Sequence, residues 1–238
     1  MTRAKVSAFD SMAPEYDSWF EDKGKLVFNT EIEALRQVLP SLPKPWLEIG
    51  VGSGRFAQNL GIQNGLDPSA ELLEFAKNRG INASLGIGEA LPFRSDIFGA
   101  VLLIATLCFV DSPLEVLMEA NRVLSKGGNV VLGLVLGESP WGKLYELKKG
   151  KGHHFYKHAT FYSYAGVETL LTQAGLSTEK VISTLFQKPD EMEHMEFPQE
   201  GFYPDAGFTV IVARKDQTEE TLPARRGKEN VSRGFNCR

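Results

Sequence analysis

The feature that most constrains this chain is residues 47–54, "LEIGVGSG", where one acid and three glycines occupy every second position. The apolar run just before the glycines predicts a buried strand. Glycines in the turn that follows permit unusual dihedrals and let a ligand approach the main chain. Free N–H groups at the start of the next helix favour an anionic ligand group. The stretch therefore predicts a strand, a ligand-binding loop and a helix, with a plain tight turn as the alternative.

Short apolar runs alternate with helical patterns along the rest of the chain. Strands are expected at residues 45–50, 64–67, 81–88, 98–109, 129–136, 180–186 and 208–214, and helices at 55–61, 68–80, 112–126 and 164–174. The third of these helices should begin at the capping box "SPLE", with Ser112 as its cap and Pro113 in its first position, and end at Gly127. The alternation predicts an α/β fold with a doubly wound, mainly parallel sheet and right-handed crossovers.

The 238 residues suffice for one substantial domain with additions. Residues 1–40 look helical and aromatic, and because no strand accompanies them we interpret them as an amino-terminal lid. Residues 41–215 form the expected ligand-binding domain. The end, residues 216–238, is polar and basic, and we predict that it is a disordered tail.

Charge and cysteine content exclude several classes of partner. The net charge of −4 conceals an asymmetry, since residues 214–238 carry +3 and residues 1–213 carry −7. An acidic body argues against a nucleic-acid partner, because phosphate binding needs a basic surface. The start lacks the apolar core of a signal peptide, and the longest apolar run, residues 100–110, is too short to span a membrane. Two cysteines, Cys108 and Cys237, fit a reducing compartment, so we expect a cytoplasmic protein.

Two acids narrow the identity of the ligand. Glu48, two residues before Gly50, would repel the pyrophosphate of a dinucleotide but attract an ammonium group. Asp67 ends the second strand, where a carboxylate can accept both hydroxyls of a ribose. S-adenosylmethionine combines an amino-acid end with a nucleoside and fits both positions. An NAD-dependent oxidoreductase is a weaker alternative, because Gly54 comes one residue early for the Gly-x-Gly-x-x-Gly loop.

With these residues in place, the chain resembles the class I S-adenosylmethionine-dependent methyltransferases, in particular the branch of ubiquinone and menaquinone biosynthesis. "LEIGVGSGRF" matches the first motif of the family, "GLDPSAELLEFA" the acidic second, "GIGEALPF" the adenine loop and "EANRVLSKGG" the helix before the fifth strand. "FDSMAPEYDSWF" is similar to the amino-terminal helix that these enzymes fold over the cofactor. The matches cover roughly residues 9–136.

The resemblance implies a Rossmann-like, seven-stranded sheet whose last strand is antiparallel. It implies that Glu48 and the glycines hold the methionine end of the cofactor, and that Asp67 holds the ribose. Residues 88–89 would meet the adenine edge, partly through backbone N–H groups. The cofactor-binding residues expected on this basis are Tyr16, Glu48, Gly50, Gly52, Gly54, Asp67, Pro68, Gly88, Glu89 and Ala105. Two positions depart from the family pattern: Ile87 stands where relatives often have an acid, and Gly99 replaces a frequent Asp.

Methyl transfer is an in-line displacement at an activated sulfonium carbon, so the protein mainly aligns donor and acceptor and excludes water. An obligatory catalytic side chain need not exist. Thr106 and Phe109 are the residues best placed to face the methyl group, with ordinary strand-end packing as the alternative. Tyr16 either has a functional position, capping the cofactor or touching the acceptor, or simply anchors the lid. The chain lacks an Asn/Asp-Pro-Pro-Tyr/Phe element, which argues against methylation of DNA amines or glutamine side chains.

Two further segments were candidates for the acceptor site. His154 and His158 stand four apart, but a metal site would need a true helix and another ligand, so no metal is expected. We interpret their segment as a connection that flanks the acceptor, with either histidine as a candidate general base. Residues 187–207 contain six acids and form either a lid that attracts a cationic acceptor or a solvated loop.

The sequence thus predicts an enzyme that transfers a methyl group from S-adenosylmethionine to a small-molecule acceptor and leaves S-adenosylhomocysteine. A protein that binds the cofactor as a sensor or scaffold, without turnover, is the alternative from another class. Alignment-only catalysis leaves no diagnostic side chain by which the sequence could separate the two. The oligomeric state is open at this point.

Overall fold

The computed structural model describes residues 3–216, so the predicted tail beyond Asp216 lies outside the described residues. Within them, eight strands form one sheet in the order β3-β2-β1-β4-β5-β8-β6-β7. The strands are β1 (Trp46–Ile49), β2 (Asn64–Asp67), β3 (Asn82–Leu85), β4 (Phe98–Ile104), β5 (Leu124–Leu134), β6 (Leu176–Thr184), β7 (Gln199–Glu200) and β8 (Phe208–Lys215). The five strands β3, β2, β1, β4 and β5 are parallel, whereas β8 runs antiparallel to both of its neighbours, β5 and β6. This confirms the predicted Rossmann-like sheet, to which the two-residue β7 adds an edge strand.

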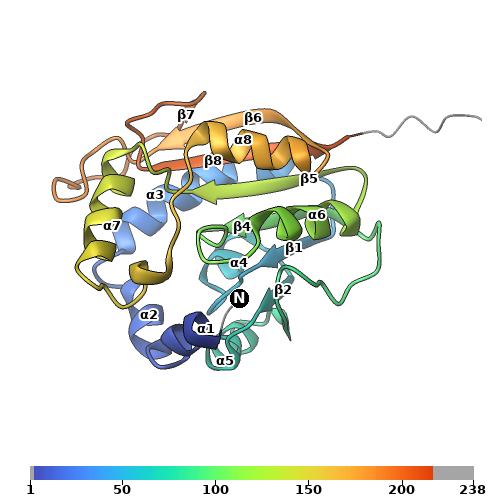
Figure 1. Cartoon of the computed structure of the whole chain (residues 1–238), viewed down its shortest axis with the longest axis horizontal. Coiled ribbons are helices and arrows are strands. Elements are labelled where there is room, and N and C mark those ends of the chain that lie inside the picture. Colours follow the sequence, from blue (N-terminus) through green and yellow to red (C-terminus); the bar gives the residue numbers. More distant parts are fainter. Residues whose placement is uncertain (1–2, 217–238) are drawn as a thin grey trace, which may run out of the picture.

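Helices cover both faces of the sheet, as Figure 1 shows. They are α1 (Arg3–Asp10), α2 (Ala13–Trp19), α3 (Lys25–Arg36), α4 (Arg55–Leu60), α5 (Ala70–Asn78), α6 (Pro113–Val123), α7 (Pro140–Gly150) and α8 (Tyr164–Gln173), with short 3-10 turns η1 (Leu39–Ser41) and η2 (Tyr156–His158). Apolar side chains of α3, α4 and α5 form one buried cluster, and those of α6 and α8 form another. The sheet therefore separates two cores.

Strand β4 shows how the sequence builds both cores. Leu102 packs into the cluster that contains α3, α4 and α5, whereas Val101 and Leu103 pack into the cluster that contains α6 and α8. All seven residues of β4 are buried. A strand covered on both faces is apolar throughout, which is the pattern of this run. The strand order reverses between β1 and β4, so the loops that follow these two strands open side by side.

Several predicted boundaries are wrong, and those around β4, α6 and β5 differ as follows. Strand β4 ends at Ile104 rather than at residue 109, because Ala105 takes a positive φ of 51° that breaks the extended run. Helix α6 ends at Val123, and β5 begins directly at Leu124 rather than at residue 129. Extended backbone pairs Leu124 with Phe98 of β4 before the main ladder begins.

The start of α6 also differs from the predicted capping box. The Ser112 side chain makes no cap hydrogen bond. The backbone N–H groups of Asp111 and Ser112 donate instead to Oε1 of Glu89, at 2.9 and 3.4 Å. A carboxylate from a distant loop thus replaces the local serine at the positive end of the helix.

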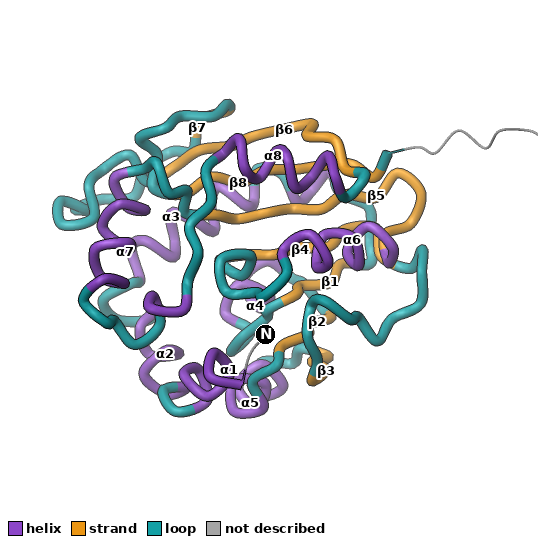
Figure 2. Tube along the Cα trace, viewed as in Figure 1, coloured by secondary structure: helices purple, strands orange, loops and turns teal. Residues whose placement is uncertain are grey.

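Helix α7 and the loop behind it were not predicted. Ser139 caps α7 by accepting a hydrogen bond from Gly142 N–H at 3.0 Å, and Pro140 occupies the first helical position. The loop that follows α7 runs towards α1 and α2 (Figure 2). There His154 Nε2 lies 2.9 Å from the carbonyl oxygen of Ala8. Two segments far apart in sequence therefore meet over the carboxyl ends of the strands.

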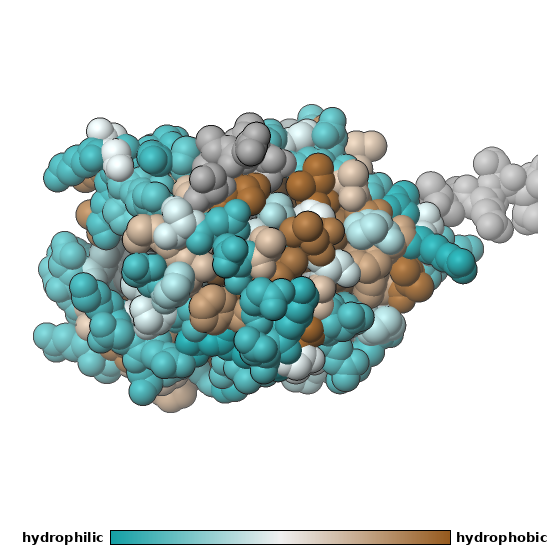
Figure 3. Space-filling model, turned by 90° about the horizontal axis from the view of Figure 1, so that it is seen from below, coloured by the Kyte–Doolittle hydropathy of each residue, from teal (hydrophilic) through white to brown (hydrophobic). Residues whose placement is uncertain are grey.

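The surface on the side of α1 and α5 is largely hydrophilic, with apolar patches among the polar side chains (Figure 3). Leu85 at the end of β3 is among the exposed apolar residues. Across the described part of the chain, no helix combines the length and the apolar composition that crossing a membrane requires.

The unexpected Gly99 has a steric explanation. Its N–H group donates to the carbonyl oxygen of Pro45 at 2.8 Å. The space that a Cβ atom would take at this position is filled by the backbone carbonyl of Pro43. A side chain such as the aspartate common in the family would therefore displace the segment that leads into β1.

We predict that Gly99→Ala lowers the free energy of unfolding by about 1–3 kcal/mol, because backbone must shift to admit the methyl group. Gly150→Ala is the matched control, since a Cβ atom there meets open space at the end of α7. Urea denaturation of both variants measures the effect. Equal midpoints for Gly99→Ala and the unmodified protein would contradict the explanation.

Candidate cofactor and acceptor site

The glycine loop begins where β1 ends. Gly50 N–H donates to the carbonyl oxygen of Leu66 at 2.7 Å, and Gly50 takes a left-handed φ of 75°. The Thr106 side chain fills the space that a Cβ atom at Gly50 would need, and its hydroxyl donates to Ile104 O at 3.0 Å. Thr106 therefore packs the loops after β1 and β4 against each other, while it also lines the cavity described below.

Asp67 holds the middle of the glycine loop. Its Oδ2 atom accepts the backbone N–H of Gly52, and its Oδ1 atom accepts that of Ser69, both at 2.9 Å. Burial raises the pKa of Asp67 to about 6, although these two backbone donors oppose the rise. The carboxylate is thus ionised above pH 6 and retains lone pairs that can accept hydroxyl groups.

Glu48 is buried on β1, with 1% of its surface exposed. Its Oε2 atom has no hydrogen-bond partner in the described part of the chain. Burial, followed by the negative charge of Asp67, raises the pKa of Glu48 well above its ordinary value. A buried acceptor without a partner is costly, and an ammonium group would relieve that cost. The next two residues, Ile49 and Gly50, line the cavity.

A cavity of about 380 Å³ lies at the carboxyl ends of β1, β2 and β4, within the size range of small-molecule sites. It brings together most of the predicted residues. Those that line it are Tyr16, Gly50, Gly52, Asp67, Pro68, Gly88, Glu89, Ala105, Thr106 and Phe109. Glu48 and Gly54 lie behind this wall rather than in it. Gly54, with a φ of 81°, begins α4 and packs closely against Ala76.

The adenine end of the expected site is built from backbone. Gly88 lies close to Ile49 and Val116, with space for little more than its own hydrogen atoms on that side. Burial would raise the pKa of Glu89, but the backbone N–H groups of Asp111 and Ser112, just before α6, donate to its carboxylate and hold the pKa below the ordinary value. The contact of residues 88–89 to adenine stays a prediction, and backbone groups are the part of Glu89 that is left for it because its carboxylate is already engaged.

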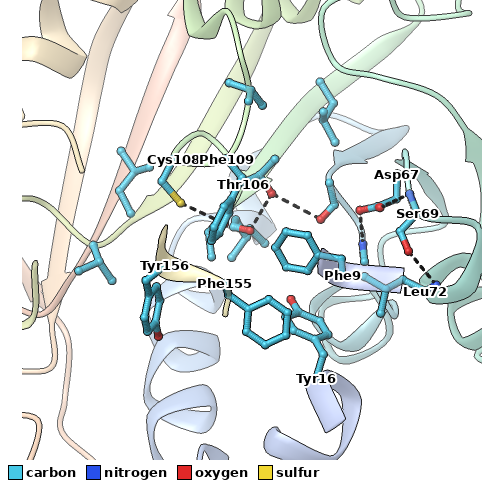
Figure 4. A pocket seen from close by; sticks show the side chains of 18 of the residues that line it. Phe9, Tyr16, Asp67, Ser69, Leu72, Thr106, Cys108, Phe109, Phe155 and Tyr156 are labelled. Carbon is cyan, nitrogen blue, oxygen red and sulfur yellow. Dashed lines mark hydrogen bonds between the residues drawn. The ribbon is translucent and has the colours of Figure 1, made fainter. Parts of the chain in front are cut away.

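Aromatic rings from the amino-terminal helices and from the segments after β4 and α7 line the cavity together (Figure 4). The Phe9 ring of α1 lies 5.1 Å from Phe155, in a stacked arrangement, and 5.2 Å from Phe109, edge to face. Tyr16 of α2 lies 5.8 Å from Phe9 and approaches the glycine loop at Gly52. Burial, and then the charges of Asp67, Glu48 and Glu31, raise the pKa of Tyr16, so its hydroxyl stays protonated.

An ion-pair cluster that the sequence did not reveal fastens α2 to the glycine loop. Asp17 accepts hydrogen bonds from Arg55 Nε at 2.9 Å, Arg55 Nη2 at 2.7 Å and Arg79 Nη2 at 2.8 Å. Arg79 also donates to Ser53 O at 2.7 Å. Burial alone would raise the pKa of Asp17, but the arginine hydrogen bonds outweigh it and lower the pKa to about 2. We call Asp17, Arg55 and Arg79 the lid clamp.

We call one part of the cavity the aromatic chamber; it is lined by Glu31, Tyr145, His153, Tyr156 and Phe161. Tyr145 stacks on Tyr156 at 4.3 Å, and His153 stacks on the other side at 4.5 Å. Sequence reasoning missed Glu31. The available signal was its place in α3, where it follows Phe28 by three residues and precedes Leu35 by four, on the buried face of the helix.

The segment with His154 and His158 and the acidic loop of residues 187–207 do not form the sites that the sequence suggested for them. Helix α7 ends at Gly150, so no α-helix carries His154 and His158, and no group of three potential metal ligands occurs in residues 3–216. Residues 187–207 do not line the cavity. Within that loop, Glu196 accepts the backbone N–H groups of Phe186 and Gln187 at 2.6 and 3.1 Å, so it holds the loop together.

Comparison with known proteins agrees with this geometry. A sequence family described as "Methyltransferase domain" matches residues 47–132. A crystal structure from Thermotoga maritima, named a SAM-dependent methyltransferase and "possible histamine N-methyltransferase", is 37% identical, with a TM-score of 0.83 over 89% of this chain and 100% of that one. An uncharacterised protein of Methanocaldococcus jannaschii is 39% identical over 210 residues, which are 88% of this chain and all of that one.

A more distant structure shares the fold. Geranyl diphosphate C-methyltransferase from Streptomyces coelicolor, solved with S-adenosylhomocysteine, is 13% identical with a TM-score of 0.57 over 79% of this chain and 77% of that one.

We predict that Asp17→Asn loosens the lid, because the uncharged side chain cannot hold both arginines. The free energy of unfolding should fall by about 2 kcal/mol, and proteolysis of the first 24 residues should accelerate. The folded pKa of about 2 lies below the ordinary 3.8, so this contribution is present above pH 3.8 and is lost as the pH falls towards 2. Glu21→Gln is the control, because Glu21 is exposed and pairs with Arg55 alone. Identical behaviour of the two variants would argue against the clamp.

We also predict that S-adenosylhomocysteine releases a proton from Glu48 when it binds in the pH range where burial keeps this group protonated. Burial favours the protonated form of Glu48, and an adjacent ammonium group reverses that preference. Calorimetry in buffers of different ionisation enthalpy counts the proton. Methylthioadenosine, which lacks the amino-acid end, should bind without this release, and Glu48→Gln should abolish it. Proton release that persists in Glu48→Gln would assign it to another group.

Proposed function

Since this chain belongs to the S-adenosylmethionine-dependent methyltransferases, we propose that it methylates a small molecule held in the aromatic chamber. The observation that carries this proposal is the continuous cavity that joins the Asp67 end to the chamber beneath α1 and α2. The aromatic walls favour a compact, partly apolar acceptor. The acidic body of residues 1–213 disfavours nucleic acid.

The residues at the Asp67 end fit the cofactor. Glu48 supplies a buried carboxylate without a partner for the ammonium group, and Gly50, Gly52 and Gly54 shape the backbone around the methionine end. Asp67 offers acceptors to the ribose. The remaining contacts to the nucleoside come from Pro68, Gly88, Glu89 and Ala105. Bound there, S-adenosylmethionine would supply the methyl group on an activated sulfonium.

We assign catalysis to alignment and to exclusion of water. In this scheme the lid within residues 1–40 comprises α1 and α2, whereas α3 packs against β6 and β8 of the main domain, residues 41–215. Tyr16 and Phe109 lie where they can orient the acceptor, and Thr106 keeps the two loops in register. His154 fastens the lid through Ala8 rather than acting as a base.

Two comparisons favour an acceptor with a planar ring. The motifs resemble those of quinone-biosynthesis methyltransferases, and the Thermotoga maritima relative carries the name of a possible histamine N-methyltransferase. The aromatic lining of the chamber suits a flat ligand. The low cysteine content of the sequence favours a cytoplasmic enzyme.

We predict that methyl-labelled S-adenosylmethionine and the purified protein transfer label to small metabolites in a fractionated cell extract. Asp67→Ala should reduce the label at least about tenfold, because the ribose loses its acceptor and the glycine loop its anchor. Mass spectrometry of the labelled fraction identifies the acceptor. Label found only in protein or nucleic acid would overturn the small-molecule assignment, and proven cofactor binding without any label would favour a sensor.

A further inference from the structure

We propose that Glu31 makes this enzyme specific for an acceptor that carries a positively charged amine. The inference rests on the proposed function and names the substrate class of the same site. It depends on the position of one carboxylate, on the rings around it and on the other charges of the cavity.

The Glu31 carboxylate has no function in the fold itself. Helix α3 buries Phe28, Ile32 and Leu35, whereas Glu31 lines the cavity. Neither a hydrogen bond nor an ion pair joins Glu31 to any described residue. An acid without a partner in an apolar site costs free energy, so a hydrophobic residue here would give a more stable protein. The retained carboxylate therefore indicates a ligand of opposite charge.

The surroundings of Glu31 suit a cation. Glu31 lines the same cavity as Tyr16, Tyr145 and Tyr156, and its charge contributes to the raised pKa of each of these phenols. The faces of aromatic rings attract ammonium groups, and the attraction grows when water is excluded. A carboxylate in a cavity lined by aromatic residues can bind an ammonium by charge and by cation–π contact together, and it repels a carboxylate ligand.

The other charges that line the cavity do not cancel Glu31. Lys148 lies with its ammonium 5.5 Å from the centre of the Tyr145 ring, so it is held by cation–π attraction, and it makes no ion pair with Glu31 among residues 3–216. Burial, and then the charge of Lys148, lower the pKa of His153, which favours its neutral form. Asp67 already engages two backbone donors at the opposite end.

The Glu31 carboxylate can also accept the proton that the ammonium group of the acceptor must lose before methyl transfer. An amine attacks only as the free base, so its ammonium form first gives a proton to Glu31. The nitrogen lone pair then forms the bond to the methyl carbon, while the carbon–sulfur bond breaks and its electron pair stays on sulfur as a thioether. Burial raises the pKa of Glu31 to about 8, which suits a group that exchanges a proton near neutral pH.

The test compares three probes of the same shape: 2-phenylethylamine, 2-phenylethanol and phenylacetate. Each is titrated into the protein saturated with S-adenosylhomocysteine, and binding is followed by calorimetry. We expect the amine to bind at least about tenfold more tightly than the alcohol, and phenylacetate to bind least. Equal affinity for the three probes, or preference for phenylacetate, would overturn the proposal.

Substitution of Glu31 by Gln, which has nearly the same shape but no charge, tests whether the charge of Glu31 causes the preference for an amine. Glu31→Gln should weaken binding of 2-phenylethylamine at least about tenfold and improve binding of phenylacetate, because the repulsion is removed. Glu33→Gln is the matched control on the same helix, since Glu33 is exposed and, among residues 3–216, pairs with Arg36. Improved phenylacetate binding also shows that Glu31→Gln is folded. Equal amine affinity in the Glu31 and Glu33 variants would contradict the assignment.

Cofactor binding distinguishes failure of this inference from failure of the proposed function. If the unmodified protein does not bind S-adenosylhomocysteine, the proposed function itself fails. If it binds the cofactor and labels a metabolite that carries no amine, only the assignment of Glu31 fails. Glu31→Gln should bind S-adenosylhomocysteine as the unmodified protein does, because Glu31 lies in the chamber and not at the Asp67 end.

Discussion

The hydrogen bond from Gly52 N–H to the Asp67 carboxylate is the interaction on which the rest of the site depends. It ties the loop after β1 to the end of β2, and the second oxygen of Asp67 ties in the start of α5 through Ser69. Because β1 and β2 are hydrogen-bonded neighbours in the sheet, the positions of Asp67 at the end of β2 and of the loop after β1 are fixed relative to each other. The backbone is thereby shaped before any ligand arrives, which lowers the cost of binding.

The lid, α1 and α2, is attached to the glycine loop by ion pairs. The lid clamp joins α2 to Arg55, the first residue of the helix that follows the glycines, and to Arg79 after α5. Aromatic rings from α1, α2 and the segment after α7 then close over the cavity. Closure of this kind excludes water and holds donor and acceptor in line, which is the main requirement of methyl transfer. Stability of the lid and affinity for the cofactor are therefore coupled through the same loop.

Sequence patterns predicted the elements whose signals are local. The apolar runs gave β1, β2, β4 and β8, and the spacing of Glu48, the glycines and Asp67 indicated the cofactor. Prediction failed where contacts join distant segments. Asp17 and Arg55 are 38 residues apart, and the capping of α6 by Glu89 spans 22 residues. Local sequence patterns do not indicate contacts between residues so far apart in the chain.

The functional residues missed in the sequence were missed for related reasons. Glu31 looks like one more surface acid of an amphipathic helix until α3 is placed against the cavity. Tyr145 lies in α7, whose Ser-Pro start is a helix signal, yet its function depends on stacking with Tyr156. For residues 187–207 the sequence left open a lid or a solvated loop; these residues do not line the cavity, and Glu196 stabilises its own loop.

The central claim is that one cavity holds the cofactor at Asp67 and presents its methyl-bearing sulfur to the aromatic chamber. A crystal structure with bound S-adenosylhomocysteine tests it most directly. We predict ribose hydroxyls on Asp67, the amino group near Glu48, and the sulfur directed towards Phe109 and the chamber. A ligand bound elsewhere, or one whose sulfur points away from the chamber, would contradict the account.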